Sequence, residues 1–132
     1  EDTVTIMVYM CATDLESKSG MASNDLAEMA SANLSDNVNI IVYTGGCKSW
    51  RTTGISNSVN QIYRIRQGGL QQLVSDDGSK VMTDPATLSS FISWTAANRR
   101  ISRRARASCW IMERYCKTAI STTITTVPPK RK

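Results

Sequence analysis

The chain has 132 residues and a net charge of +5, and its length predicts one domain built around a single modest core. It contains no histidine, so neither a Ser-His-Asp nor a Cys-His catalytic set can be assembled from this chain alone. The charge is unevenly divided: residues 1–98 carry six basic and ten acidic side chains (−4), whereas residues 99–132 carry ten basic side chains and one acidic one (+9).

Two apolar runs in the first part of the chain predict buried strands. Val4–Ala12 and Val38–Thr44 are almost continuously apolar and rich in β-forming residues, a pattern typical of parallel strands covered on both faces. Between them, Asp14–Gly20 is predicted to be a polar loop, and Gly20–Ala32 has the apolar spacing of an amphipathic helix. Strand, helix and strand together predict a βαβ unit.

The middle of the chain predicts a hairpin followed by a second helix. Gln61–Arg66 and Leu70–Val74 flank a Gln-Gly-Gly turn sequence, which favours two antiparallel strands. Asp84 is a good helix N-cap and is followed by a proline, so we expect a helix that runs from there to about Ala97.

The character of the sequence changes after Asn98. Arg99–Arg106 contains five arginines and no acid, and no convincing periodicity follows it. We therefore predict a domain over residues 1–98 and a divergent basic tail over residues 99–132, to which we assign no helix or strand. Its composition indicates either a disordered segment or an out-of-frame reading.

Five segments of residues 1–98 form a specific combination in their order and spacing. They read VYMCATDLES, NDLAEM, NIIVYTGGCKSW, ISNSVNQIYRI and DPATLSSFISW. This combination resembles the clostripain family of cysteine peptidases. The resemblance implies an α/β fold, a caspase-like three-layer αβα sandwich with a mostly parallel sheet, here incomplete and with an added β-hairpin. It also implies an endopeptidase that cleaves peptides and proteins after Arg or Lys.

The catalytic residues that this resemblance implies have no counterpart in the sequence. In the family a His-Gly pair ends the third core strand and an Asp-Ala-Cys segment ends a later one, and neither occurs here. Cys11 and Cys47 match family positions other than the nucleophile, and Cys109 and Cys116 match no family motif. No catalytic residue is carried over. We expect an inactive N-terminal fragment, which a C-terminal chain would have to complete.

The segment Cys109–Glu113 has a second reading in a shifted frame. When each codon takes the last base of one codon and the first two of the next, the standard genetic code forces Leu, Asp and Gly at three of the four positions. The remaining codon, the third in order, is made from the codons of Ile111 and Met112 and reads His, Tyr or Asn. Leu-Asp-His-Gly is therefore permitted close to where the family has His-Gly, which favours a frameshift over natural divergence.

Polar residues after the two predicted strands are candidate site residues. Asp14 and Glu16 would suit a basic substrate side chain, and the alternative is a solvated loop in which Asp14 caps a turn. Gly45 and Gly46 are predicted to form a turn that ends a strand, because no phosphate-binding glycine pattern accompanies them. The cysteine spacings suit no zinc site and leave the disulfide state open, and Cys11 is expected to be a buried thiol. We expect no cofactor or metal.

The arginine-rich tail supports a competing function. Clustered arginines neutralise phosphates, so Arg99–Arg106 would make the chain a small binding protein for nucleic acid or another polyanion. The family signature in residues 1–98 favours the peptidase over this alternative. Salt-sensitive binding of the isolated tail to a polyanion would favour the alternative instead.

The sequence also bears on location. No apolar run reaches the roughly 18 residues that a membrane span needs. Glu1 and Asp2 stand where a signal peptide would carry basic residues, so none is expected in this chain. The family resemblance nevertheless implies a secreted or cell-surface protein.

Overall fold

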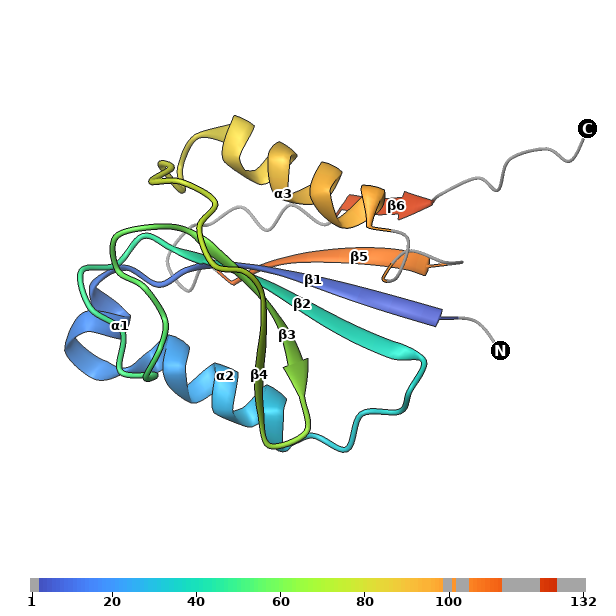
Figure 1. Ribbon diagram of the computed structural model, residues 1–132, viewed down its shortest axis with the longest axis horizontal. Helices are drawn as coiled ribbons and strands as arrows, with labels where there is room; N and C mark the ends of the chain where they lie inside the picture. Colours follow the sequence, from blue (N-terminus) through green and yellow to red (C-terminus); the bar gives the residue numbers. More distant parts are fainter. Residues whose placement is uncertain (1–2, 99–100, 102–104, 113–121, 126–132) are drawn as a thin grey trace, which may run out of the picture.

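The computed structural model describes residues 3–98 and 101, together with the backbone of 105–112 and 122–125. These residues form one six-stranded sheet with helices on both faces (Figure 1), with strand order β4-β3-β2-β1-β5-β6. The elements are β1 (Thr3–Cys11), α1 (Thr13–Ser19), α2 (Met21–Ser31), β2 (Val38–Gly45), β3 (Gln61–Arg66), β4 (Gly69–Val74), α3 (Pro85–Ala97), β5 (Ala105–Met112) and β6 (Thr122–Thr125).

The centre of the sheet is parallel, and its outer parts are antiparallel. β1 lies between two parallel neighbours, with Val4 opposite Val38 of β2 and Arg106 of β5. The predicted βαβ unit is therefore confirmed as β1, α2 and β2. The predicted hairpin is confirmed as β3 and β4, and it extends the same sheet because β3 pairs antiparallel with β2. The caspase-like αβα arrangement predicted for the chain is the fold observed.

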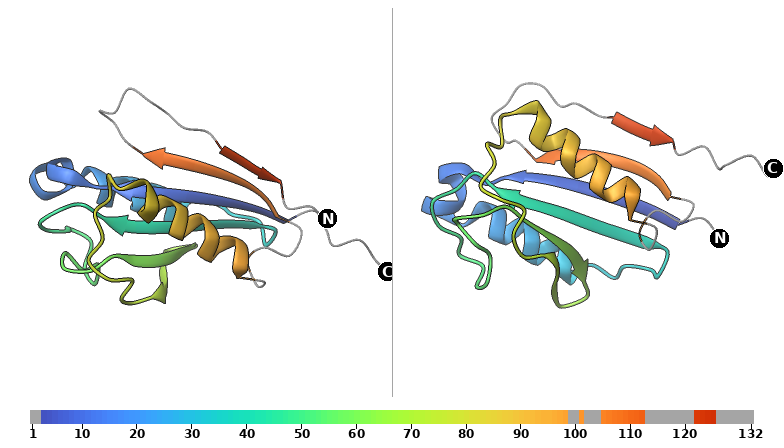
Figure 2. Two further views of the ribbon diagram at one scale, coloured as in Figure 1. Left: turned by 90° about the horizontal axis from the view of Figure 1, so that it is seen from above. Right: turned by 45° about the horizontal axis from the view of Figure 1, so that its top comes forward.

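Two apolar clusters lie on opposite faces of the sheet. Alternate residues of β1 and β2 point to α2 on one face, where Ala22, Leu26 and Ala30 are buried. The intervening residues point to α3 on the other face, where Phe91 packs on Tyr43 with ring centroids 5.1 Å apart. Figure 2 shows the helices in these two layers. Because both faces of β2 are covered, its residues from Asn39 onward are all buried, as the continuous apolar run predicts.

The helix predicted to start at Asp84 is confirmed. Asp84 is its N-cap, and its carboxylate accepts a hydrogen bond of 2.9 Å from the backbone N–H of Ala86. Pro85 occupies the first helical position, where the missing N–H costs no intrahelical hydrogen bond.

The structure differs from the sequence-based expectation at two places. The segment predicted as a polar loop forms helix α1, which ends at Gly20 in the left-handed conformation (φ +65°). Beyond Asn98, where no element is predicted, β5 pairs with β1 and β6 pairs with β5. A strand can form there without a local signal because the exposed edge of β1 supplies its backbone partners. Apart from Ile101, which is buried in the cluster beneath α3, the remainder of residues 99–132 lies outside the described residues. The domain boundary near Asn98 stays a prediction.

Candidate functional site at the carboxyl ends of the parallel strands

The carboxyl ends of β1, β2 and β5 meet at one edge of the sheet because these strands are parallel. Open α/β sheets place their binding and catalytic residues at this edge. Two backbone hydrogen bonds continue the pairing beyond the strands: Ala12 N–H donates to the Gly45 carbonyl and Thr13 N–H to the Gly46 carbonyl, both at 3.1 Å. The segments after β1 and β2 therefore leave the sheet together.

The buried carboxylate of Glu16 organises this edge. Its side chain is fully buried (0% exposed) and accepts hydrogen bonds from the backbone N–H groups of Ser23 (2.8 Å) and Arg51 (2.7 Å). The Ser23 hydroxyl donates a further bond to the same carboxylate. Since Ser23 lies in the first turn of α2, the negative charge also meets the positive end of that helix.

These hydrogen bonds decide the protonation state of Glu16. Burial by itself raises the pKa of the carboxyl, but the hydrogen bonds from Ser23 and Arg51 outweigh it and hold the pKa below its usual value. Glu16 is therefore a charged, structural carboxylate at neutral pH.

Ser23 and Arg51 carry the connection from Glu16 into the loop between β2 and β3. The Ser23 hydroxyl oxygen accepts a hydrogen bond of 2.9 Å from the backbone N–H of Thr52. The Arg51 guanidinium donates to the Lys18 carbonyl at 2.6 Å and packs on Gly20, where an added Cβ would lie 2.6 Å from its Cδ. The loop after β2 is thus held against the α1–α2 corner by contacts from both sides.

The two carboxylates proposed to bind a basic substrate side chain, Asp14 and Glu16, lie in different surroundings. Asp14 is exposed on α1 and pairs with Lys18 at 3.0 Å, and the hydrogen bond and charge of Lys18 lower its pKa. Glu16 is buried and its oxygens are occupied, so it is unavailable to a substrate and does not lie in a solvated loop. Its role is visible only in the tertiary structure, because its partners lie 7 and 35 residues further along the chain.

β2 ends at the two glycines as predicted, although Gly45 is still its last residue, opposite Cys11 of β1, and the chain bends at Gly46. Gly46 has φ of +76°, and an added Cβ would lie 2.8 Å from the Sγ of Cys11. At Gly45 an added Cβ would lie 2.3 Å from the Nδ2 of Asn60. These glycines therefore allow the close approach of neighbouring side chains.

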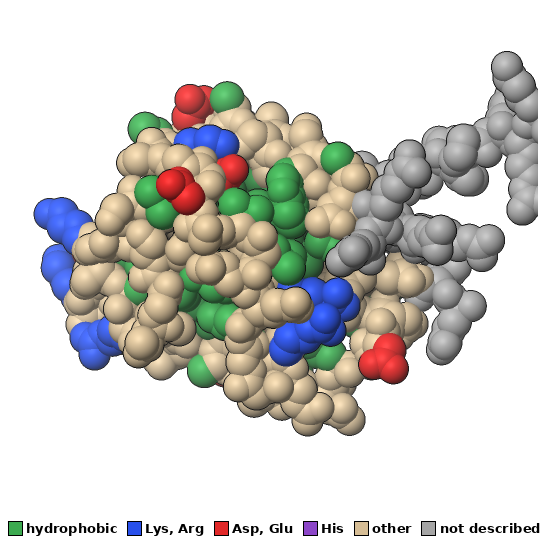
Figure 3. Space-filling view, viewed as in Figure 1, with side chains coloured by type: hydrophobic (Ala, Val, Ile, Leu, Met, Phe, Trp, Pro, Cys, Tyr) green, Lys and Arg blue, Asp and Glu red, His purple; other side chains and the backbone are tan. Residues whose placement is uncertain are grey.

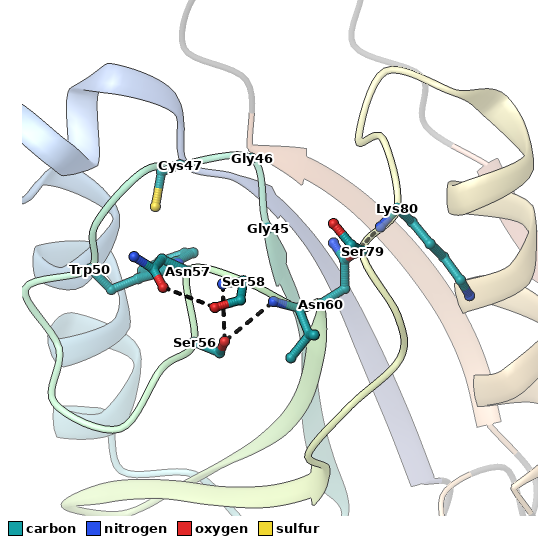
Figure 4. A pocket seen from close by; sticks show the side chains of 11 residues that line it. Gly45, Gly46, Cys47, Trp50, Ser56, Asn57, Ser58, Asn60, Ser79 and Lys80 are labelled. Carbon is teal, nitrogen blue, oxygen red and sulfur yellow. Dashed lines mark hydrogen bonds between the residues drawn. The ribbon is translucent and has the colours of Figure 1, made fainter.

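A small polar hollow of about 60 Å³ lies beside these glycines, under the loop between β2 and β3 (Figure 4). Ser56 shapes one wall, since its hydroxyl oxygen accepts hydrogen bonds from the backbone N–H groups of Ser58 (3.1 Å) and Val59 (3.2 Å). The indole N–H of Trp50 is buried and has no hydrogen-bond partner among the described residues. The lining is Gly45, Gly46, Cys47, Trp50, Ser56, Asn57, Ser58, Val59, Asn60, Ser79 and Lys80. Sequence reasoning missed this hollow because its walls come from three separate segments.

Cys47, which follows β2 at this edge, is poorly suited to act as a nucleophile. Burial raises the pKa of the Cys47 thiol to about 11, and the nearby Glu16 carboxylate adds to the rise. The thiol therefore stays protonated at neutral pH. Cys11 is half-buried, rather than fully buried as its apolar run predicts. Cys109 lies in β5, and Cys116 lies outside the described residues.

Other site types find little support in the described part of the chain. It holds no group of three or more His, Cys, Asp or Glu side chains that would bind a metal ion. None of its helices is long and apolar enough to cross a membrane. The polyanion-binding interpretation depends on Arg99–Arg106, whose side chains lie outside the described residues.

Comparison with known proteins agrees with this arrangement. A solved structure titled "B. fragilis cysteine protease" superposes with a TM-score of 0.58 at 15% sequence identity, over 94% of this chain and 98% of that chain. The fold is thus one found in a cysteine protease. The family model of the clostripain family matches residues 8–104, so the chain belongs to the clostripain family. No curated protein sequence matches it.

Proposed function

We propose that this chain is the scaffold of a clostripain-type endopeptidase for cleavage after Arg or Lys, and that the chain alone does not hydrolyse peptides. The observation that carries the proposal is a family fold in a sequence with no histidine. A cysteine peptidase needs a base to activate its thiol and an acid to protonate the leaving amine. No histidine is present at the described carboxyl edge, and the Cys47 thiol has a raised pKa.

The position of β5 supports this division between scaffold and chemistry. It is the third parallel strand, and its last residue, Met112, lies opposite Met10 of β1 at the carboxyl edge. The family resemblance implies a His-Gly pair at the end of the third core strand. The shifted reading that permits His spans the codons of Ile111 and Met112, at the carboxyl end of β5. A restored frame would therefore present an imidazole at the candidate site.

A second polypeptide is a natural source of the missing nucleophile. This chain covers 98% of the solved B. fragilis chain, so that chain has a comparable length. We propose that a C-terminal chain with an Asp-Ala-Cys segment supplies the thiol beside the end of β5. The net charge of −4 on residues 1–98 suits substrates with basic side chains. We also propose a secreted or cell-surface location, which the family resemblance implies.

A peptidase assay tests whether the chain is inactive. The purified chain is incubated with a fluorogenic Arg-amide, a Lys-amide and a Glu-amide control, beside a variant with all four cysteines changed to Ser. We expect all rates to equal the buffer blank. Hydrolysis of the Arg-amide by the natural chain that is absent from the variant would show that one of its own cysteines acts without histidine, and the proposal would be wrong.

The coding DNA tests the frameshift. We expect that sequencing across the codons after Asn98 shows a shifted frame with a His codon at the Ile111–Met112 position and an Asp-Ala-Cys segment downstream. The protein expressed from the corrected frame should cleave the Arg-amide and spare the Glu-amide. A Tyr or Asn codon, or no downstream Asp-Ala-Cys, would instead show a naturally divergent relative.

A further inference from the structure

Arg64 occupies an unusual place on the α3 side of the sheet. It lies in β3, directly opposite Ile41 of β2, and Ile62 is two residues earlier on the same strand. Ile41 and Ile62 are almost fully buried in the apolar cluster beneath α3. Since strand residues two apart share a face, Arg64 lies on the same face of β3 as Ile62, beside this cluster.

The half-buried guanidinium of Arg64 has no counter-charge in the described part of the chain. Neither ion pair there involves it, and no hydrogen bond reaches it. Burial lowers its pKa, and the neighbouring charge of Arg66 lowers it further, so the nearest influential charge has the same sign. Arg66 itself donates to the Gln71 side chain at 3.0 Å. A partly desolvated cation without an acceptor is unfavourable, so an acidic partner would stabilise this site.

Partly buried apolar side chains lie on the strand next to Arg64. On β4, Gln71 lies opposite Arg64 and Val74 lies opposite Ile62, and a register shift between these two pairs leaves both Leu73 and Val74 packed against the cluster beneath α3. Leu73 and Val74 are only partly buried against the cluster beneath α3. Figure 3 shows hydrophobic side chains open to solvent between α3 and the hairpin, with a group of basic side chains beside them.

We propose that this surface, formed by Arg64, Arg66, Leu73 and Val74, docks an acidic segment of another polypeptide, whose carboxylates lie between apolar side chains. Carboxylates would pair with the two guanidinium groups, which suit bidentate contacts. The apolar side chains would cover Leu73 and Val74. A nucleic acid is the poorer match, because residues 1–98 have a net charge of −4 and the arginines adjoin aliphatic side chains. The docking surface is independent of peptidase activity.

A peptide-binding experiment tests the proposal on the full chain. The probe is a fluorescein-labelled ten-residue peptide of alternating leucine and glutamate, with one control in which glutamine replaces glutamate and another in which serine replaces leucine. We expect saturable binding of the leucine–glutamate peptide alone, with amide NMR shifts confined to β3, β4 and α3. Arg64→Gln should weaken it about tenfold or more, as removing one partner of a desolvated charge pair does.

Lys48→Gln is the matched control, because it removes one exposed positive charge at the other end of the strands. It should leave the affinity unchanged. Equal weakening by both variants, or no saturable binding, would overturn the proposal. So would binding of an oligo-dT strand that Arg64→Gln abolishes while the peptide does not bind.

Thermal unfolding of Arg64→Met separates docking from a structural role. An arginine retained for a partner is not needed by the isolated fold, so the midpoint should be unchanged or higher than in the natural chain. A clear fall in the midpoint would show that Arg64 serves the fold instead, and would overturn the proposal.

Discussion

Replacing Glu16 with glutamine should destabilise the fold markedly, because one buried carboxylate joins α1, α2 and the loop after β2. Glutamine keeps one acceptor oxygen but turns its amide NH₂ toward the backbone N–H of either Ser23 or Arg51, because these two donors bond to different carboxylate oxygens. At least one charge-assisted hydrogen bond is lost, worth about 1.5–3 kcal/mol, and a buried N–H loses its acceptor. We expect a loss of about 2–4 kcal/mol, a large part of the roughly 5–15 kcal/mol that stabilises a typical domain.

Urea unfolding followed by tryptophan fluorescence measures this loss, with Ser23→Ala as the matched control. The control removes the hydroxyl that bonds to Glu16 and Thr52 but leaves the carboxylate charge, so it should cost less, about 1–2 kcal/mol. Hydrogen exchange should speed up at the amides of Ser23, Arg51 and Thr52 in Glu16→Gln. If Glu16→Gln unfolds within about 0.5 kcal/mol of the natural chain, the carboxylate does not organise this edge.

The same substitution should alter the response to acid. Because the folded-state pKa of Glu16 lies below its usual value, its contribution is fully present above the unfolded pKa of about 4.3 and is lost as pH falls through the folded pKa. The natural chain should therefore lose stability below about pH 4. Glu16→Gln should lack this component, and an unchanged difference between the two proteins from pH 7 to pH 3 would contradict the assignment.

Three further substitutions or reactions test the local geometry. Gly46→Ala should lower the free energy of unfolding by about 1–3 kcal/mol, because Gly46 has a positive φ and an added Cβ would meet Cys11. Gly68→Ala is the control, with a positive φ but open space around it, and should lower it by only about 1 kcal/mol. Equal losses in urea unfolding would rule out the contact with Cys11. Asp84→Ala should lose about 1 kcal/mol with the α3 N-cap, and Asp84→Asn should retain most of it, as thermal unfolding will show. Iodoacetamide should label Cys47 slowly at pH 8 and faster as pH approaches 11; a rate that levels off near pH 8 would contradict its raised pKa.

Local sequence patterns predicted most of the elements. The apolar runs of β1 and β2 predict buried parallel strands because both faces of those strands are covered. The observed bounds differ from the predicted ones by one residue at each end of β1 and at the C-terminal end of β2. Turn chemistry predicted the hairpin, since Gly68 takes φ of +81° between β3 and β4. The N-cap at Asp84 set the start of α3. In each case the decisive interactions lie within a few residues, so the sequence records them directly.

The candidate site depended on interactions between distant residues. The sequence alone determined that no histidine is available and that Asp14, Glu16, Gly45 and Gly46 follow two strands. Only the tertiary structure decided that Asp14 is exposed whereas Glu16 is buried, because the donors to Glu16 come from α2 and from a loop 35 residues away.

The edge of β1 shows the same limit for the fold. No local periodicity marks Ala105–Met112 as a strand, yet its backbone pairs with β1 over eight positions. Backbone hydrogen bonds between strands are largely indifferent to side-chain identity, so an open edge can recruit a segment whose own sequence favours no structure. Local propensity therefore determined β1, α2, β2, the hairpin and α3 but not α1, and long-range pairing and burial decided β5 and the role of Glu16.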